Sequence, residues 1–127
     1  MSDRRLVSTE TKYEAQFGYS RAVRQGDVIR VAGTAGLGPD GQVVSDDVVE
    51  QARRAIQIIS SALEELGSSL DDVIMTRVYV SDVRNIDSVA AVHGEVFRDI
   101  RPATSILKVD FVDPKILVEI EAEAMVR

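Results

Sequence analysis

Three glutamates occupy alternate positions near the end of the chain, at Glu119, Glu121 and Glu123. Alternate residues of an extended strand point to the same side, so the three carboxylates would share one face of a sheet. Carboxylates can ligate metal ions or act as acids and bases. Same-face neighbours lie about 6 to 7 Å apart, however, so the three do not converge on one ion. We expect no metal site. If this charged face is buried against other copies of the chain, we expect Arg77 or Lys108 to contact Glu121 or Glu123.

A run of five small residues is the second candidate for chemistry, Ala32-Gly33-Thr34-Ala35-Gly36. Small residues at the end of a strand let a ligand approach the backbone amides and carbonyls closely. A glycine inside a strand is also typical of a β-bulge, and the residues alone favour the bulge. The run could therefore serve binding, architecture or both.

Two isolated side chains could take part in proton transfer. His93 titrates near neutral pH and could be an acid or base, although a structural contact at a helix edge is the more common role of such a histidine. Tyr19 carries a hydroxyl group, yet a tyrosine is more often a packing residue. Neither residue points to one reaction when it is considered alone.

The elements that must position these residues begin with two expected strands at the end of the chain. One strand would place Ser105 and Leu107 on one side, and Thr104, Ile106 and Lys108 on the charged side. Asp113-Pro114-Lys115 has turn chemistry. The next strand would place Val118 and Ile120 on an apolar side and the glutamates on the other. The short connection predicts an antiparallel hairpin with one apolar and one acidic face.

The rest of the chain supplies the other layers of an α+β fold. Residues 1–13 should cross the surface or form a short edge strand, and strands are expected at 19–23, 28–31 and 73–80. The apolar stripes predict one helix from Ser45, as its N-cap, to Gly67 and a second over residues 87–98. Both helices must cover the same face of the sheet, because the other face is charged. One domain should span residues 1–127.

Composition excludes several classes of function. The 127 residues include no cysteine, which rules out disulfides and thiolate chemistry. The net charge of -6 would repel phosphate backbones, so we expect no nucleic-acid partner. No apolar run has the length of a signal peptide or a membrane span, so we expect a cytoplasmic protein without a membrane partner.

Two motifs resemble the C-terminal signature of the RidA/YjgF family of enamine/imine deaminases. They are Pro102-Ala103-Thr104-Ser105 and Val118-Glu119-Ile120-Glu121-Ala122. The resemblance extends upstream through Gly18-Tyr19, Val31-Ala32-Gly33-Thr34, Gln51-Ala52-Arg53 and Thr76-Arg77-Val78-Tyr79-Val80. It implies the chorismate-mutase-like fold, with a mixed, mainly antiparallel sheet and two helices on one face. It also implies a homotrimer with three pockets between subunits, a small-molecule metabolite as ligand, and no cofactor.

The resemblance assigns roles to individual residues. Glu119 matches the catalytic glutamate that orients water. Gly33 matches the residue whose backbone contacts the substrate, and Thr34 lies beside it. Tyr19 matches the pocket tyrosine. Thr104 stands where the active deaminases carry the arginine that grips the substrate carboxylate. A threonine hydroxyl cannot reproduce that bidentate charged contact, so the affinity for 2-imino acids should fall.

Three interpretations of this departure remain open. Arg101 could move in and bind the substrate carboxylate, although an ordinary surface arginine is the more common role. The pocket could instead serve a less anionic enamine, imine or amide-like compound. Alternatively, the protein could be a non-catalytic binder of a small metabolite or of another protein. Separately, His93 could contribute an acid or base across a subunit boundary.

Overall fold

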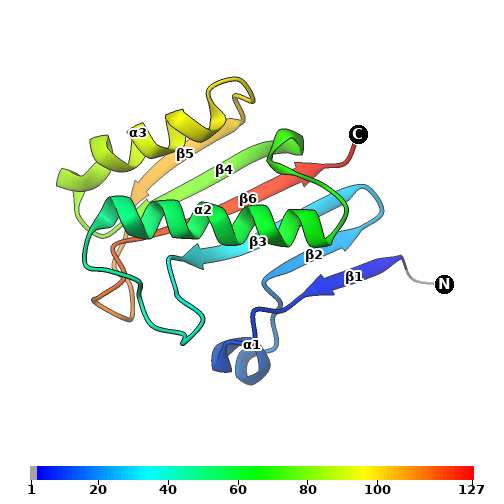
Figure 1. Ribbon diagram of the computed structural model, residues 1–127, viewed down its shortest axis with the longest axis horizontal. Coiled ribbons are helices and arrows are strands. Elements are labelled where there is room, and N and C mark those ends of the chain that lie inside the picture. The colour runs from blue at the N-terminus through cyan, green and yellow to red at the C-terminus, as the bar shows by residue number, and fades with distance from the viewer. Residues whose placement is uncertain (1–2) are drawn as a thin grey trace.

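The computed structural model describes residues 3–127, in which six strands form one sheet (Figure 1). The strands lie in the order β1-β2-β3-β6-β4-β5. Every neighbouring pair is antiparallel except β4 and β5, which run parallel. The prediction of a mixed, mainly antiparallel sheet is therefore confirmed. The strands are β1 (Arg4–Val7), β2 (Ala22–Gln25), β3 (Val28–Ala35), β4 (Val73–Val80), β5 (Ala103–Lys108) and β6 (Val118–Met125).

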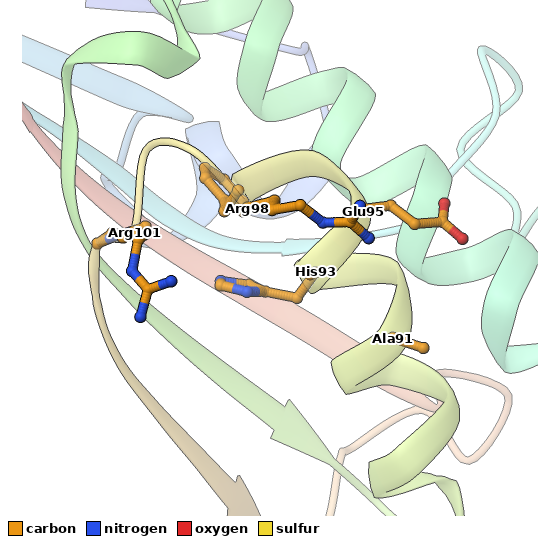
Figure 2. Close-up of a pocket in the computed structure, with 8 residues that line it drawn as sticks. Ala91, His93, Glu95, Arg98 and Arg101 are labelled. Atoms are coloured by element: carbon orange, nitrogen blue, oxygen red, sulfur yellow. The ribbon is translucent and has the colours of Figure 1, made fainter.

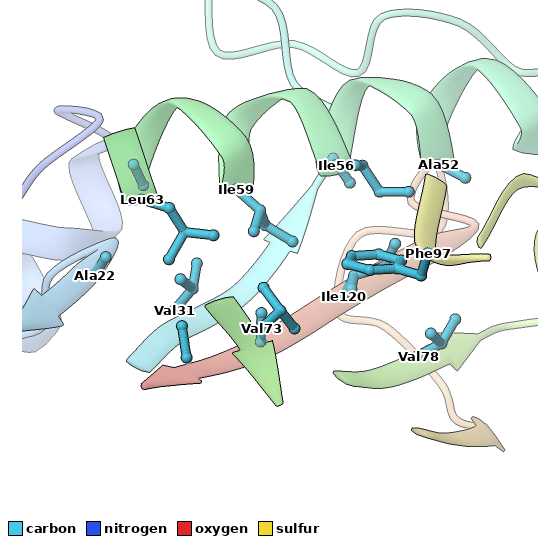
Figure 3. Packing of buried hydrophobic residues seen from close by; sticks show 14 of the residues in the cluster. Ala22, Val31, Ala52, Ile56, Ile59, Leu63, Val73, Val78, Phe97 and Ile120 are labelled. Atoms are coloured by element: carbon cyan, nitrogen blue, oxygen red, sulfur yellow. The ribbon is translucent and has the colours of Figure 1, made fainter. Parts of the chain in front are cut away.

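Two long helices, α2 (Val48–Glu65) and α3 (Ile86–Phe97), cover the same face of this sheet (Figure 1). The apolar stripe of α2 packs on the central strands, where Ile59 and Leu63 lie above Val31 and Ile120 (Figure 3). Burying such aliphatic side chains contributes about 1.5 to 3 kcal/mol each. The opposite face, which we call the uncovered face, has no helix of the described residues packed on it. The alternation predicted for β6 is confirmed, because Val118 and Ile120 are buried in this core.

The predicted hairpin between the last two strands is wrong, because β4 lies between β5 and β6. Helix α3 connects β4 to β5 and returns the chain to the same end of the sheet, so these two strands pair in parallel. The connection after β5 then carries the chain past β4, and β6 inserts between β3 and β4. In this central position β6 has a partner along both edges, which a terminal hairpin strand would not have.

The side assignment of β5 is also wrong. Thr104 lies opposite Thr76 in the parallel register and Ile106 lies opposite Val78, and both partners are fully buried under the helices. Lys108 follows on the same side, whereas Ser105 and Leu107 face the uncovered side. Adjacent Ile106 and Leu107 make either alternation plausible, and a shift by one residue exchanges the two faces. The pairing with β4 therefore decides which side of β5 is covered.

The ends of the other helices and strands differ from the predicted ends by a few residues. Asp47, not Ser45, is the N-cap of α2, since its side chain accepts a hydrogen bond from the Val49 amide. Gly67 follows the helix at a φ of 82°, as predicted. The edge strand expected within residues 1–13 is confirmed as β1, while β2 starts at Ala22 and leaves Tyr19 in a loop.

Helix α1 (Lys12–Phe17) was not predicted. Thr11 accepts a hydrogen bond from the Glu14 amide, and the Glu14 carboxylate accepts one from the Thr11 amide, which is a capping box. Gly18 ends this helix in the left-handed conformation. Short 3-10 helices η1 (Leu70–Asp72) and η2 (Val83–Asn85) flank β4. Within residues 3–127, no helix combines the length and apolar character that crossing a membrane would require.

Candidate functional site

A bulge interrupts the ladder between β3 and β6. Val31 pairs with Ala122, yet Thr34 pairs with Ile120, so Ala32 and Gly33 lie opposite one residue of β6. The bulge predicted from the run of small residues is confirmed. It displaces Gly33 from the regular pleat and brings its backbone close to the side chains of β6.

Arg21 fixes the geometry of this bulge. Its Nη1 atom donates to the Gly33 carbonyl at 2.6 Å and to the Thr34 hydroxyl at 3.1 Å. The side chain is only 6% exposed, and its buried Nε atom has no hydrogen-bond partner among the described residues. Sequence reasoning missed Arg21, although a charged residue within the otherwise apolar run 19–23 was a signal. A buried guanidinium beside a strand carbonyl places a fixed positive charge at the bulge.

The carboxylate of Glu119 lies over the backbone of Gly33. A Cβ atom built on Gly33 would be 2.7 Å from Oε1 of Glu119, so only glycine leaves room for the carboxylate there. Burial raises the pKa of Glu119; the Arg21 charge opposes that shift, and Glu121 adds to it. A half-buried carboxylate with a raised pKa can exchange a proton with a bound ligand or water.

Tyr19 completes the group that we call the bulge cluster, which consists of Tyr19, Arg21, Gly33 and Glu119. The Cζ atom of Arg21 lies 5.7 Å from the centre of the Tyr19 ring, within range of a cation–π contact. Tyr19 remains 40% exposed. The cluster thus presents an aromatic ring, a carboxylate and bare backbone where β3 ends and β6 begins.

Thr34 plays a structural part beside the bulge cluster. Its side chain is fully buried, donates to the Ala32 carbonyl at 2.7 Å and accepts from Arg21. Its register partner Ile120 faces the helices. The hydroxyl of Thr34 therefore stabilises the bulge from the covered side.

A second group of predicted residues lines a pocket of about 650 Å³ between α3 and the start of β5. The His93 ring and the Arg101 guanidinium point toward each other there (Figure 2). The Arg101 amide donates to the Phe97 carbonyl at 2.8 Å, and Arg101 has a φ of 56°. This left-handed residue reverses the chain after α3 and aims its side chain into the pocket. We call this cavity the α3–β5 pocket.

A chain of side-chain hydrogen bonds connects this pocket to β5. Nε2 of His93 lies 2.8 Å from the Thr76 hydroxyl, which lies 2.7 Å from the Thr104 hydroxyl. Thr104 also donates to the Pro102 carbonyl at 3.1 Å. Thr76 is fully buried, and burial lowers the pKa of His93. Thr104 therefore serves a hydroxyl network that ends on His93.

The predicted site residues do not meet within one chain. Tyr19, Gly33 and Glu119 belong to the bulge cluster, whereas His93, Arg101 and Thr104 belong to the α3–β5 pocket. Thr104 shares the covered side with Thr76, while Glu119 alternates with buried Val118 and Ile120 and so faces the uncovered side. The sheet itself separates the two groups.

The other glutamates of the uncovered face have partners that differ from the prediction. The Tyr79 hydroxyl donates to Glu121, and this bond raises the pKa of Tyr79. Arg30 lies 3.4 Å from Glu123. Lys108 pairs with Asp110 at 3.1 Å instead. Arg77 lies directly opposite Glu121 in the ladder of β4 and β6, yet the described residues show no ion pair of Arg77 or Lys108 with Glu121 or Glu123. The contact expected in a buried assembly stays a prediction.

Comparison with known proteins identifies the family to which this chain belongs. The family model described as Endoribonuclease L-PSP matches residues 9–126. A RutC family protein of Pyrococcus abyssi is 34% identical over 120 residues, which cover 94% of each chain. This chain is a member of the RidA/YjgF family. The resemblance stated from the two C-terminal motifs is thereby confirmed.

Solved structures and named enzymes of the RidA/YjgF family are similar over nearly the whole chain. The crystal structure of Rv2704 from Mycobacterium tuberculosis, described as a member of the YjgF/YER057c/UK114 family, has a TM-score of 0.89 and 43% identity. The match covers 98% of this chain and 100% of Rv2704. A mouse 2-iminobutanoate/2-iminopropanoate deaminase is 33% identical over 124 residues, which cover 96% of this chain and 91% of the mouse protein. The chorismate-mutase-like α+β fold expected for a RidA/YjgF protein agrees with these neighbours.

Proposed function

We propose that this RidA/YjgF protein hydrolyses small imines and releases ammonia. The observation that carries the proposal is the bulge cluster, in which a half-buried glutamate with a raised pKa lies against the bare backbone of Gly33. A deaminase acting on 2-imino acids is the named activity of the mouse relative. The bulge cluster contains the residue types that such a hydrolysis needs, namely a carboxylate to orient water and polar backbone to hold the substrate.

The reaction is an addition of water followed by loss of ammonia. An enamine tautomerises to the imine, and the oxygen of a water molecule attacks the imine carbon while the C=N π electrons move to nitrogen. Glu119 accepts one proton from the attacking water and passes it to the nitrogen, which gives a carbinolamine. It then carries the hydroxyl proton to the nitrogen, so the C–N bond breaks, ammonia leaves and the electrons of the O–H bond form the C=O bond. The carbonyl product retains the water oxygen. The reaction involves no net oxidation or reduction, so it needs no redox cofactor.

Assembly would join the two groups of site residues. We propose a homotrimer in which the bulge cluster of one copy faces the α3–β5 pocket of the next, so that Glu119 and Arg101 approach one substrate from different chains. Among the strands of residues 3–127, β5 has a neighbour on one edge only, and Leu107 and Met125 leave apolar area on the uncovered face. An unpaired strand edge beside exposed apolar side chains favours association.

Arg101 is the residue that we assign to the substrate carboxylate. Thr104 occupies the position of the family arginine, but its hydroxyl is engaged by Thr76 and Pro102. Arg101 lines the α3–β5 pocket and makes no ion pair within the described residues. A guanidinium free of a protein carboxylate can bind an anionic ligand through two parallel hydrogen bonds.

Ammonia release tests the proposal directly. The protein is incubated with freshly generated 2-aminoacrylate, and ammonia is compared with the spontaneous rate at several protein concentrations. We expect turnover that falls at least tenfold in both variants. Glu119→Gln removes a catalytic acid–base group, which costs about 100-fold or more in rate, and Arg101→Ala removes the charged contact with the substrate carboxylate. Release no faster than the spontaneous rate would contradict the proposal.

Two control variants test whether activity depends on the positions of Glu119 and Arg101 or only on the overall charge around them. Glu123→Gln removes a carboxylate four residues along the same strand, and Arg98→Ala removes an arginine that lines the same pocket. We expect both variants to retain most of the activity. If Glu119→Gln and Glu123→Gln lost the same share of the ammonia-releasing activity, the activity would depend on the overall charge of the face and not on a glutamate at the bulge.

The alternative is a non-catalytic binder of a small metabolite. Thr104 is the observation that favours it, since this residue cannot supply the bidentate contact of the family arginine. Saturable binding of a carboxylate-bearing amine without ammonia release would support this alternative. RNA is a poor ligand in either case, because three glutamates lie on the uncovered face of a chain with a net charge of -6.

A further inference from the structure

The hydrogen bonds of Thr104, Thr76 and His93 have only one consistent proton order. A carbonyl oxygen can only accept, so the contact at 3.1 Å uses the single hydroxyl proton of Thr104 on the carbonyl of Pro102. The Thr76 hydroxyl must then donate to Thr104 across 2.7 Å. With its own proton used, Thr76 can only accept from Nε2 of His93 at 2.8 Å. His93 must therefore carry its proton on Nε2.

This order leaves Nδ1 of His93 with a free lone pair. In a neutral imidazole one nitrogen donates and the other accepts. Nδ1 has no hydrogen-bond partner among residues 3–127, and His93 lines the α3–β5 pocket together with Arg101. The ring of His93 points toward the Arg101 guanidinium (Figure 2). Arg98 also lines the pocket, but Arg101 is the arginine that the His93 ring faces, so an anion-binding group and a neutral acceptor lie side by side.

We propose that Thr104 fixes the tautomer of His93 through Thr76, and that Nδ1 of His93 is the acceptor with which the α3–β5 pocket binds its ligand. The ligand class is a small molecule in which a carboxylate lies next to an N–H donor. Arg101 binds the carboxylate, and Nδ1 accepts from the nitrogen. Thr104 is a positioning residue, because it acts through Thr76 and His93.

The proposal explains a role for the threonine that replaces the family arginine. In this chain the position no longer carries the positive charge, but it determines which ring nitrogen of His93 is free. A compound with a carboxylate and only acceptor groups, such as a 2-oxo acid, would leave Nδ1 without a donor and bind less well. The pocket therefore discriminates the nitrogen-bearing substrate from its carbonyl product. The identity of the ligand as a substrate rests on the proposed function, whereas the tautomer does not.

Nitrogen NMR of the histidine ring tests the tautomer without ambiguity, because His93 is the only histidine in the chain. Two-bond and three-bond couplings from the ring carbon protons to ¹⁵N distinguish the Nε2–H form from the Nδ1–H form in the intact protein. We expect the Nε2–H form to predominate above the pKa of His93. A predominant Nδ1–H form would overturn the proposal.

Three variants of β5 test the part that Thr104 plays. Thr104→Val removes the acceptor for Thr76, whose hydroxyl can then turn and donate to Nε2, so the share of the Nδ1–H form should rise. Since one neutral hydrogen bond biases the ratio, the change should be roughly fivefold. Thr104→Ser keeps the hydroxyl and should retain the wild-type ratio, as should Ser105→Ala on the other side of the strand. An unchanged ratio in Thr104→Val would refute the link.

Two probe ligands test the acceptor role of Nδ1. L-Alanine carries a carboxylate and an N–H donor, whereas pyruvate carries the carboxylate alone beside a carbonyl. We expect L-alanine to shift the Nδ1 resonance and pyruvate to shift it several-fold less, with both effects lost in Arg101→Ala. Equal shifts, or none with L-alanine, would overturn the acceptor role. Absence of ammonia release from 2-aminoacrylate, with the tautomer as expected, would instead contradict only the proposed hydrolysis.

Discussion

The Oε1 atom of Glu119 occupies the space in which a side chain at Gly33 would begin, 2.7 Å from the ideal Cβ position. No real Cβ contact is that short, so the glycine and the glutamate are geometrically dependent on each other. The bulge displaces the backbone of β3 at this point, and Arg21 holds the Gly33 carbonyl. The position of the carboxylate therefore depends on Gly33, on the bulge of β3 and on Arg21, all of which lie far from Glu119 in sequence.

Gly33→Ala should displace the Glu119 carboxylate and abolish most of the ammonia-releasing activity. The methyl group meets only the far end of a flexible side chain, which can move aside, so the free energy of unfolding should fall by less than about 1 kcal/mol. Urea denaturation measures this second effect. The double variant Gly33→Ala, Glu119→Ala should recover even that small loss, because the atoms that clash are gone.

Gly94→Ala is the matched control for this substitution. A Cβ at Gly94 would have no heavy atom within 4 Å, and the residue lies inside α3. Alanine should therefore increase the free energy of unfolding by up to about 1 kcal/mol. Similar destabilisation by the two alanines would show that crowding by Glu119 is not the cause.

Glu119→Gln should stabilise the protein at pH 7. Burial raises the pKa of Glu119 above its ordinary value of 4.5, so the folded state binds its proton more tightly than the unfolded state does. Stability then falls as the pH rises from the unfolded to the folded pKa, and the whole cost is present above the folded pKa. The urea midpoint of the variant should exceed that of the wild type at pH 7, and the difference should shrink toward pH 4.

Glu123→Gln supplies the control for this pH dependence. The Glu123 carboxylate lies 3.4 Å from the exposed Arg30 guanidinium, and a surface pair of this kind contributes little. The urea midpoint should change by a small amount at both pH values. A Glu119→Gln variant that is less stable than the wild type at pH 7 would show that the carboxylate is held by favourable contacts.

The sequence was sufficient to predict the sheet, the two covering helices and the bulge, because each depends on a local periodicity or on glycine. It was insufficient for β5. In Ser105-Ile106-Leu107-Lys108 either alternation has one apolar residue on the inside, so only the partner strand decides the register. The predicted hairpin failed for a related reason, since strand order is a property of the whole sheet.

The individual residues of the candidate site could be proposed from the sequence, but their arrangement in space could not. Glu119 lies against Gly33, and Tyr19 is connected to this pair through Arg21. The role of Thr104 could not be predicted, because its partners Thr76 and His93 come from β4 and α3. The capping box of α1 was readable from Thr11 and Glu14, three residues apart, followed by Gly18.

Gln51→Leu should destabilise the protein by about 3 kcal/mol. The Gln51 side chain is fully buried, and its amide nitrogen donates to the carbonyls of Ser45 and Lys115, while its oxygen accepts from the Leu117 amide. Leucine would leave these backbone groups buried without partners, at a cost of about 1 to 3 kcal/mol each before relaxation. Gln57→Leu, on the exposed side of the same helix, should change the urea midpoint little.

The pKa of His93 should lie below the ordinary value of 6.5 in an NMR titration of its ring. Burial disfavours the charged imidazolium, and Arg98, Arg101 and Glu95 line the same pocket. The folded state then binds fewer protons than the unfolded state, so stability is lost as the pH falls through 6.5. His93→Gln should flatten this part of the stability profile. A titration midpoint above 6.5 would mean that a carboxylate, and not burial, dominates the environment of the ring.

Leu107→Glu should dissociate the proposed trimer without unfolding the chain. Leu107 is 45% exposed on the uncovered face of β5, the strand with an unpaired edge, so a charge there would be buried against the next copy. Light scattering should report one chain for the variant and three for the wild type, while circular dichroism stays unchanged. Ammonia release should fall when the assembly dissociates, because Glu119 and Arg101 of different copies no longer meet.

Val112→Glu adds the same charge at a fully exposed loop position and should leave both the mass of the assembly and the activity unchanged. A wild-type protein that sediments as one chain would refute the shared pocket.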